Sequence, residues 1–489
     1  DGIEACLKRG QPVRNRQEAS MSVIEAFAPL QTSASVLNDV HSGLNRTRVA
    51  EVARPATIAA ARALIANRAQ ARQPLAMMGA RHSMGGQQFL SDGMVVDTAA
   101  LNRIETFDDQ RGLVVVEAGI RWPALLDWLQ RNPANRGHWT VRQKQTGGDD
   151  FSLGGSIAAN VHGRGLGLAP LVDDIEWIEV IDAQGRRRQL SREQEAERFG
   201  LVVGGYGLFG LISRVCLRLI PDQTLEREVS LVRAADLMTK FDQAMARGCR
   251  YGDFQFAVDP ESPDFLDMGI LSCYRPVPGN PTERPLAMGS AGFRHLLHLA
   301  HVDKSRAFAE YADYYLSSNG QRYPLVAQHS GVYLDGYHVD IDHALGHCGS
   351  EMISELYVPR PEFARFMGLA AESLRQHRAD PIYGTVRLIE RDAVTALAWA
   401  REPWACIVFN LHIEHRGNGP LEAAAAFRGL IDCALDCGGS FYLTYHRWAR
   451  PEQLEAAHPT LRAVLARKRE LDPHGIFQSD WYRHLQRCL

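Results

Sequence analysis

Three glycine-rich segments, each beside a short apolar run, constrain the fold of this 489-residue chain more than any other feature. They are GARHSMGG at 79–86, QTGGDDFSLGGSIAANVHG at 145–163 and GGYGLFG at 204–210. Because glycine has no Cβ, such turns bring backbone N–H groups close to a ligand, and several together suit an elongated anion such as a pyrophosphate. A single turn of this kind usually marks only a hairpin. Three of them, two with a histidine (His82 and His162), indicate a cofactor site.

The sequence GYGLFG at 205–210 matches the GxGxxG pattern of dinucleotide-binding folds, but its surroundings do not fit that use. A dinucleotide fingerprint opens a helix, whose N-terminus holds the pyrophosphate. Here the glycines run into LISRVCLRLI, 211–220, where apolar and polar residues alternate with the period of a strand. The chain also contains no GxxxxGK followed by Ser or Thr. The pattern therefore argues against a nicotinamide-binding Rossmann fold and against a P-loop nucleotide hydrolase.

The length of the chain predicts two or three domains. Up to residue 222, short β-branched strands alternate with glycine turns, whereas longer helices and strands follow. This alternation predicts an α+β fold in which helices cover a sheet. The expected divisions are an N-terminal extension, 1–40, a first domain, 41–222, a second domain, 223–440, and a C-terminal segment, 441–489.

Composition narrows the function classes. The net charge of −3 gives no basic footprint for nucleic acid, and no apolar run approaches the roughly 20 residues of a membrane span. The nine cysteines form no CxxC pairs, and an odd number argues against a disulfide framework. We therefore expect a reducing, cytoplasmic compartment. Residues 1–20 carry charges where a signal peptide needs an apolar core.

Several motifs together resemble the FAD-binding domain of the vanillyl-alcohol-oxidase (PCMH-type) family, in particular its alditol and aldonolactone oxidases and decaprenylphosphoryl-ribose oxidase. The resemblance is carried by GARHSMGGQQF, SLGGSIAANVHGRG, VGGYGLFGLISRV and the C-terminal RKRELDPHGIFQSDWYRHL. It is strong over about 40–222 and the last fifty residues, and weak between them. It implies two α+β subdomains that hold FAD, a cap domain over the flavin ring, and a C-terminal segment that returns to the FAD domain.

The resemblance also implies a set of cofactor-binding residues. The first loop would wrap the pyrophosphate, the second would line the cofactor, Leu211 would contact the adenine side, and Tyr442 would lie near the isoalloxazine. The residues are Met78, Gly79, Ala80, Arg81, His82, Ser83, Met84, Gly85, Gly86, Ser152, Leu153, Gly154, Gly155, Ala159, His162, Leu211 and Tyr442.

His82 occupies the position from which the family forms an 8α-N-histidyl bond to FAD, so the resemblance favours a covalent flavin. The alternative is a histidine that faces the phosphates or stabilises the loop, with FAD held non-covalently. Some relatives attach the flavin a second time through a cysteine, but 142–160 contains none.

The implied activity is FAD-dependent oxidation of a CH–OH group in a sugar, polyol or other small alcohol, by hydride transfer to flavin N5 and reoxidation by O2 or another acceptor. Glu355 and Arg387 match cap positions near the substrate, where a cation and a carboxylate would assist loss of the hydroxyl proton. An ordinary salt bridge is the competing interpretation. The resemblance implies a lysine at the position where this chain has Tyr445. Either His446 or Arg447 would supply the positive charge of that lysine, or Tyr445 would itself act as acid or base.

Two further histidines are weaker candidates. His162 could orient the substrate or bond only to the backbone. His412 shares a strand face with Asn410 and could point at the substrate, although a buried core histidine is commoner. Two other functions stay open: a flavin-linked C=C reductase or oxidative cyclase, and a non-catalytic flavin-binding scaffold.

The stretch HVDIDHALGHC, 338–348, offers several metal-ligating side chains. On a strand, His338, Asp340 and Asp342 would share one face. The spacing fits no structural zinc site, so a turn with solvated charges is the preferred interpretation, and no metal is predicted. The candidate ligands are His338, Asp340, Asp342, His343, His347 and Cys348.

Overall fold

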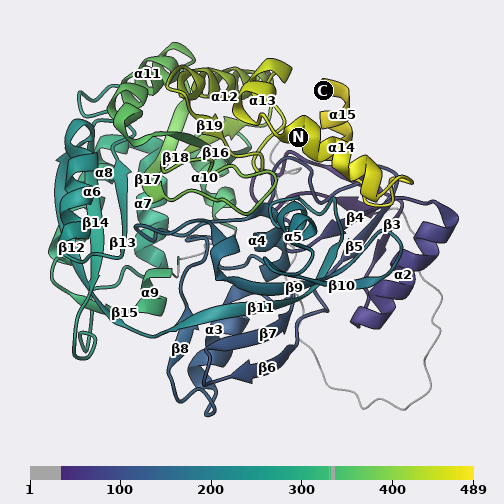
Figure 1. Ribbon diagram of the computed structural model, residues 1–489. Helices are drawn as coiled ribbons and strands as arrows, with labels where there is room; N and C mark the ends of the chain where they lie inside the picture. Colours follow the sequence, from purple (N-terminus) through teal and green to yellow (C-terminus); the bar gives the residue numbers. More distant parts are fainter. Residues whose placement is uncertain (1–34, 330, 332–335) are drawn as a thin grey trace.

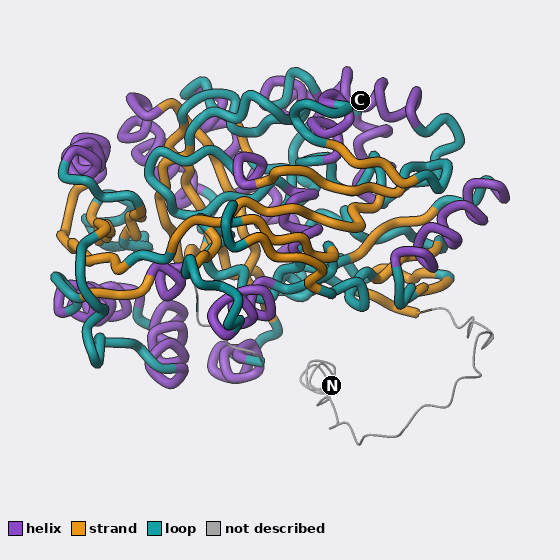
Figure 2. The backbone as a smooth tube through the Cα atoms, turned by 60° about the horizontal axis from the view of Figure 1, so that its bottom comes forward, coloured by secondary structure: helices purple, strands orange, loops and turns teal. Residues whose placement is uncertain are grey.

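A computed structural model describes residues 35–329, 331 and 336–489, and its strands form four sheets with helices outside them (Figures 1 and 2). The predicted α+β class is confirmed. The predicted extension 1–40 lies largely outside the described residues.

The first half of the chain forms three of the sheets. A six-stranded antiparallel sheet has the order β10-β9-β11-β7-β6, with β8 paired to β11; a three-stranded parallel sheet has the order β3-β5-β4; and β1 pairs with β2. The strands are β1 (Ser35–Leu37), β2 (Thr47–Val49), β3 (Glu51–Ala53), β4 (Leu75–Met78), β5 (Met94–Asp97), β6 (Ile104–Asp108), β7 (Leu113–Glu117), β8 (Trp139–Val141), β9 (Ile175–Ile181), β10 (Arg187–Leu190) and β11 (Leu211–Pro221).

The fourth sheet contains the rest of the strands. It has eight antiparallel strands in the order β15-β12-β14-β13-β17-β18-β16-β19. They are β12 (Thr224–Arg233), β13 (Tyr251–Phe256), β14 (Met268–Pro276), β15 (Arg322–Pro324), β16 (Gly349–Pro359), β17 (Asp380–Ile389), β18 (Trp404–Glu414) and β19 (Ser440–Phe441). The sheets therefore change between β11 and β12, beside the boundary expected at 222; the division into domains stays a prediction.

Fourteen α-helices of the described residues surround these sheets. They are α2 (Ile58–Ala71), α3 (Trp122–Arg131), α4 (Leu153–Ala159), α5 (Ala196–Val202), α6 (Leu237–Ala246), α7 (Ser290–Val302), α8 (Lys304–Ser317), α9 (Leu325–His329), α10 (Tyr337–Leu345), α11 (Phe363–Gln376), α12 (Gly419–Asp436), α13 (Pro451–Ala457), α14 (Leu461–Leu471) and α15 (Asp480–Cys488). Leu171–Asp174, Ala234–Asp236 and Arg360–Glu362 are 3-10 helices. None of the described helices is long and apolar enough to cross a bilayer.

The two faces of the eight-stranded sheet have different neighbours, because alternate residues of a strand point to opposite faces. On β16, Ser354 contacts His446, whose ring packs on Phe427 of α12. Glu351, three residues earlier and on the opposite face, contacts His301 of α7. Helices α11 and α12 therefore cover one face, while α7 and the interior of the molecule lie on the other.

The C-terminal segment returns to the parallel sheet of the first half. Ile476 accepts a hydrogen bond from the Leu75 backbone N–H at 2.7 Å, and the Gln478 N–H donates to the Leu75 carbonyl at 2.9 Å. The Asp480 carboxylate accepts bonds from the backbone and hydroxyl of Ser91. Ile476 and Phe477 are buried in the same core as α2. The tail therefore holds β4, the strand that leads into the first glycine-rich loop.

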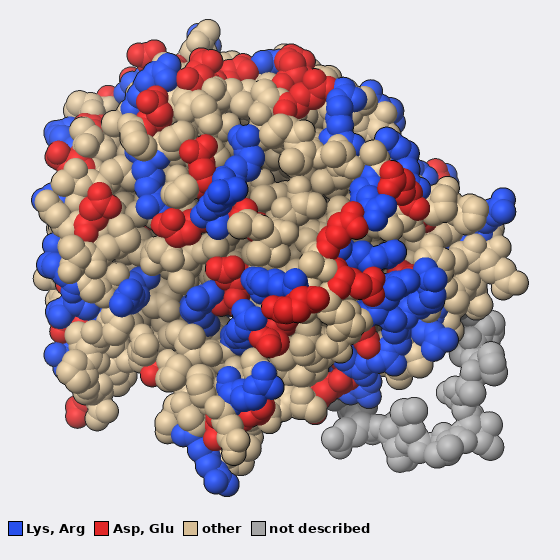
Figure 3. Space-filling view, viewed as in Figure 1, with Lys and Arg blue, Asp and Glu red and all other residues tan. Residues whose placement is uncertain are grey.

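Acidic and basic side chains are interspersed on the face shown in Figure 3. Ion pairs join neighbouring strands of the six-stranded sheet, such as Arg187 of β10 with Glu179 of β9, and Arg214 of β11 with the same glutamate. The eight described cysteines are all free thiols.

Candidate functional site

A cavity of about 310 Å³ lies between the first-half sheets and the eight-stranded sheet. Such a volume falls in the range of about 300–1,000 Å³ that is usual for ligand pockets. All three glycine-rich segments reach its wall, and strands β16, β17 and β18 provide the opposite side. The cavity thus brings together segments separated by more than 300 residues of sequence.

The first loop follows β4 and lines the cavity with its first half. Arg81 has a left-handed backbone (φ 65°), which turns the chain after Gly79. A Cβ on Gly79 would lie 2.2 Å from Ser152 Oγ, so the first and second segments touch at this glycine. Of the expected residues, Met78, Gly79, Ala80, Arg81, His82 and Ser83 line the cavity, whereas Met84, Gly85 and Gly86 lie behind the wall.

The second segment differs from the expected turn, because 153–159 form the helix α4. Ser152 caps this helix by accepting a hydrogen bond from the Gly155 N–H, and Gly154 lets the helix approach β7, since a Cβ there would lie 2.9 Å from the Ala118 carbonyl oxygen. Ser152, Gly154, Gly155 and Ala159 line the cavity; Leu153 points into the core.

The third segment is followed by a strand, as the alternating pattern predicts, and this strand is β11. Leu211 lines the cavity, as do Tyr206, Gly207, Phe209 and Gly210 of the turn before it. Tyr442 lines the cavity from the other side, and its hydroxyl donates to the Ala159 carbonyl.

His82 has one ring nitrogen engaged and one unengaged. Its Nδ1 lies 3.0 Å from His41 Nε2, and its ring packs 4.2 Å from the ring of Phe151. Its Nε2 is buried without a hydrogen-bond partner, and the Asp150 carboxylate is 4.0 Å away. Burial, together with His41 and Arg121, lowers the pKa of His82 to about 2, so the ring is neutral near pH 7.

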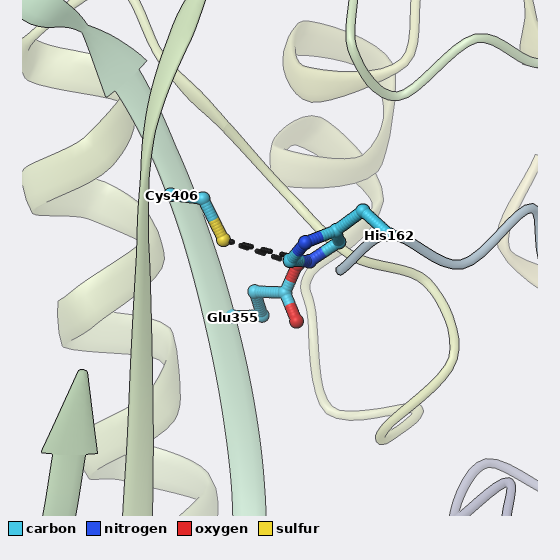
Figure 4. A group of neighbouring side chains, drawn as sticks. All are labelled: His162, Glu355 and Cys406. Carbon is cyan, nitrogen blue, oxygen red and sulfur yellow. Dashed lines mark hydrogen bonds and ion pairs between the residues drawn. The ribbon is translucent and has the colours of Figure 1, made fainter. Parts of the chain in front are cut away.

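Behind the cavity wall, His162, Glu355 and Cys406 form a fully buried group (Figure 4). His162 Nε2 lies 2.8 Å from Glu355 Oε1, and Cys406 Sγ lies 3.3 Å from the same oxygen. The other nitrogen of His162 lies 2.9 Å from the Gly163 carbonyl, the backbone contact that was one of its two expected roles. Neither His162 nor Glu355 lines the cavity.

Glu355 reaches the cavity through Tyr445. Tyr445 lines the cavity, and its hydroxyl donates to Glu355 Oε2 at 3.1 Å. Burial alone would raise the pKa of Glu355, but His162 and the Tyr357 hydroxyl hold it at about 2. Burial and the neighbouring carboxylate raise the pKa of Tyr445 well above its usual range. Tyr445 is therefore a neutral phenol whose proton points to Glu355.

Among the described residues no salt bridge joins Glu355 to Arg387, which was the competing interpretation of this pair. Within the described part of the chain, Arg387 has no ion pair, and its Nε and Nη1 are buried without hydrogen-bond partners. Arg387 lines the cavity from β17, beside Thr385 of the same strand and Asn410 of β18, whose Oγ1 and Oδ1 also lack partners. The wall thus presents unpartnered donors and acceptors to the cavity.

His446 and Arg447, the two other residues that could supply a positive charge beside Tyr445, do not line the cavity. His446 packs on Phe427, and burial lowers the pKa of its ring to about 3, so it carries no charge near neutral pH. Arg447 lies beside Asn45, 3.4 Å from its side-chain oxygen. Arg387 is the guanidinium that lines the cavity at this end.

His412 also lies outside the cavity, although Asn410 two residues earlier lines it. Its ring contacts Glu351 and His347 instead. The stretch 338–348 is not a strand, because Tyr337–Leu345 form α10 between the left-handed glycines Gly336 and Gly346. The alternative of a strand face shared by His338, Asp340 and Asp342 is therefore wrong, and the preferred turn is replaced by a helix.

Other cavity residues were not identified from the sequence. The aromatic side chains of the third turn are examples, because a glycine pattern draws attention to the backbone rather than to the intervening residues. Thr385 and Tyr383 stand two and four residues before Arg387, and the period of a strand would have placed them on its face. The additional residues include His41, Gln88, Thr98, Gln145, Phe151, Tyr206, Phe209, Tyr383 and Thr385.

The cavity fits FAD in three respects. Bare glycine backbone lines it where phosphates would bind, and Gly147 in particular has open space at its Cβ position. Apolar and aromatic residues of the third turn provide a surface for flat rings. Unpartnered polar atoms at Gln88, Gln145 and Thr444 are left for a ligand to satisfy.

Comparison with known proteins agrees with this fit. Residues 49–191 match the family described as FAD binding domain. Over 148 residues the chain is 30% identical to decaprenylphosphoryl-beta-D-ribose oxidase of Mycolicibacterium smegmatis, covering 30% of this chain and 31% of the relative. Cytokinin dehydrogenase 2 of Oryza sativa subsp. japonica is 28% identical over 34% of this chain and 30% of its own length.

A third relative is mitochondrial L-galactono-1,4-lactone dehydrogenase of Brassica oleracea, 24% identical over 41% of this chain and 32% of its own length. The chain thus matches about a third of the length of these curated relatives. The matched residues 49–191 carry the first two of the three segments that meet at the cavity, so this part of the chain is similar to the FAD binding domain family, and FAD is the cofactor that the cavity and the comparisons support.

Proposed function

We propose that this protein is an FAD-dependent oxidoreductase that oxidises a CH–OH group of a small polar molecule. The observation that carries the proposal is the wall of the cavity opposite the glycine loops. There Arg387, Thr385 and Asn410 present buried polar atoms that no described residue satisfies. Such groups are costly to leave unpaired, so they favour a ligand rich in hydroxyl groups.

Bound FAD would supply the redox chemistry by accepting a hydride from the substrate carbon. Tyr445 would bind the substrate hydroxyl by accepting a hydrogen bond from it. Because its own proton points to Glu355, its oxygen lone pairs are left to accept a hydrogen bond from the cavity. As the hydride leaves, the hydroxyl proton would pass to Tyr445 while the phenol proton moves to Glu355. Arg387 would donate to the substrate oxygen and stabilise the negative charge that develops there.

We further propose that His82 binds the flavin covalently through the 8α position. Its support is the buried, neutral imidazole on the cavity wall, with Nε2 unpartnered and Nδ1 already held by His41. A neutral ring nitrogen has the lone pair that such a bond requires.

The test begins with the purified chain precipitated in acid. Yellow colour that stays with the precipitate supports the His82 bond, and His82→Ala should then release its flavin into the supernatant. Colour in the wild-type supernatant would contradict the covalent bond while leaving FAD as cofactor. Phe151→Leu, which removes a ring neighbour of His82 but no nitrogen, serves as the control and should keep the flavin attached.

The substrate class is tested by anaerobic mixing of the flavoprotein with a panel of sugars, polyols and simple alcohols. Bleaching of the visible flavin band by a member of the panel supports the proposal. A second panel holds compounds without a CH–OH group: bleaching by these alone would favour an oxidative cyclase, and reoxidation of chemically reduced flavin by an alkene would favour a C=C reductase. No change of the flavin with any compound would favour a binding scaffold. Admission of O2 then shows whether O2 or another acceptor reoxidises the flavin. We propose that O2 would approach the flavin beside the cavity residues Ala159 and Val161.

A further inference from the structure

A second group of ligating side chains lies beside the cavity but outside the proposed flavin chemistry. It consists of His301 from α7, Glu351 from β16 and His412 from β18, and one ligand atom of each lies within 4.8 Å of the other two. Glu351 and His412 face each other in the register of the two strands. The three side chains are almost fully buried, with 0%, 5% and 6% of their surfaces exposed.

Both ring nitrogens of His301 face hydrogen-bond acceptors, although a neutral imidazole carries only one N–H. Its Nδ1 lies 2.8 Å from the Leu297 carbonyl, and its Nε2 lies 2.9 Å from Glu351 Oε1. Both neighbours accept hydrogen bonds, whereas a neutral imidazole donates only one. Either His301 is a buried cation, or a positive ion stands between Nε2 and the carboxylate. A buried ion pair pays a large desolvation cost for both of its members.

The second ring nitrogens of His301 and His412 each have a neighbour that would hold the ring in place for a metal ion. A ligating histidine usually donates its second N–H to a carbonyl or another acceptor, which fixes the ring. Nδ1 of His301 has the Leu297 carbonyl for this purpose, and Nε2 of His412 has His347 Nε2 at 3.0 Å. The Tyr337 hydroxyl donates to Glu351 Oε2, which leaves Oε1 for an ion. His412 Nδ1 lies 3.3 Å from that oxygen, close to the spacing of two ligands on one zinc ion.

We propose that His301, Glu351 and His412 bind one divalent transition-metal ion of the zinc type, through His301 Nε2, Glu351 Oε1 and His412 Nδ1. Two histidines and one glutamate form a known zinc donor set, in which the fourth position holds water or a ligand. His338, 3.4 Å from the second oxygen of Glu351, belongs to the outer layer of this site. The proposal is independent of the activity proposed above.

The site stands next to the substrate end of the cavity. Glu351 and His412 are each two residues from a cavity-lining residue on the same strand face, Ile353 and Asn410 respectively. Its ion would also join α7 to the two strands, β16 and β18, that carry this wall. We therefore expect the ion to stabilise the wall and to keep Asn410 in place.

The experiment uses the full chain with its flavin, treated with a chelator and then equilibrated with Zn²⁺. After removal of free metal, elemental analysis should find one zinc per chain, and the thermal midpoint of unfolding should rise with Zn²⁺ concentration. Glu351→Gln should abolish this stoichiometric binding. His347→Ala, which removes only the acceptor behind His412, should weaken it by about 10–100-fold. His298→Ala changes an exposed histidine on the same helix and should bind zinc like the wild type.

Two results would overturn the proposal. One is a wild-type chain that retains no zinc and gains no stability from it, which would leave His301 and Glu351 as a proton-bridged ion pair. The other is equal zinc binding by wild type and Glu351→Gln, which would place the metal elsewhere. If Glu351→Gln does not fold, His412→Asn tests the same ligand set, and the wild-type stoichiometry decides by itself whether a tight site exists.

Discussion

At the scale of single residues, the hydroxyl of Tyr445 is the group whose removal separates chemistry from binding. Tyr445→Phe keeps the ring in its buried place but removes the bond to Glu355. We expect the rate of flavin reduction at saturating alcohol to fall by about 10²–10⁴-fold, the usual contribution of a positioned acid or base. Flavin content should not change. Rapid-mixing absorbance under anaerobic conditions measures this rate.

The control for this change is Tyr314→Phe on α8, a tyrosine distant from the cavity lining. It should reduce its flavin at the wild-type rate. A Tyr445→Phe variant as fast as this control would remove Tyr445 from the proton path and leave it as a wall residue.

Arg387 offers a second residue-scale prediction, because its Nε and Nη1 are buried without hydrogen-bond partners among the described residues. Arg387→Gln retains a donor but loses the charge, and we expect kcat/KM for the bleaching alcohol to fall by about 10²–10³-fold. Steady-state kinetics measure this change. Arg391→Gln, an exposed arginine just beyond the same strand, should leave kcat/KM unchanged. Equal values for the two variants would show that the substrate oxygen binds elsewhere.

Much of the cavity wall could be predicted from the sequence, because its signal is local. Glycines beside short strands predict where backbone approaches a ligand, and most of the predicted loop residues do line the cavity. The contact of His162 with Glu355 could not be predicted by the same means, since 193 residues separate them. His412 was placed on the substrate side for a related reason. A strand period identifies its face but not how far along that face the cavity extends.

At the scale of secondary-structure elements, two segments show how local patterns can mislead. The paired glycines of 154–155 suggest a turn, but the Ser152 cap and the following alanines make a helix, in which Gly154 is needed for close packing. The charges of 338–348 suggest a solvated turn, and their alternation would also fit a strand, but left-handed glycines at both ends delimit the helix α10. In contrast, the alternation at 211–220 does form the strand β11, and Asn410 and His412 do lie on one strand, β18.

Gly154→Ala and Gly368→Ala should change the free energy of unfolding in opposite directions, because only Gly154 packs closely against a neighbour. In Gly154→Ala the new Cβ would lie 2.9 Å from backbone and side chain of Ala118, so α4 must shift. We expect a loss of about 1–3 kcal/mol in the free energy of unfolding and weaker flavin retention. Gly368→Ala lies mid-helix on α11 with nothing within 4 Å, and should gain about 0.5–1 kcal/mol.

Denaturant unfolding of both flavoproteins measures these differences. A Gly154→Ala chain as stable as the wild type would mean that α4 does not depend on its contact with Ala118. A destabilised Gly368→Ala chain would mean that the exposed face of α11 is covered in solution.

At the scale of the whole molecule, the sheets, the returning tail and the cavity depend on one another. β4 holds the first loop and is itself held by Ile476 and Phe477, while β19 and Tyr442 extend from the eight-stranded sheet to α4. Loss of the C-terminal tail would therefore expose the edge of β4.

The buried histidines give the whole molecule a predictable response to acid. Burial lowers the pKa of His329, His446 and His458 to about 3 in each case. The unfolded chain protonates these rings below about pH 6.5, whereas the folded chain does so only near pH 3. Between these values the unfolded state binds more protons, so stability falls as the pH falls. Around pH 5 the three rings together contribute a slope of about 4 kcal/mol per pH unit.

The measurement is the free energy of denaturant unfolding between pH 7 and pH 4, with the slope compared among variants. His458 packs on Phe441, and its Nε2 has no partner. In His458→Gln the slope near pH 5 should decrease by one proton, about 1.4 kcal/mol per pH unit, whatever the change in stability at pH 7. His474→Gln, an exposed site, should leave the slope unchanged. If His458→Gln retains the full wild-type slope, His458 is already charged in the folded protein, and a buried acceptor or water must stabilise that charge.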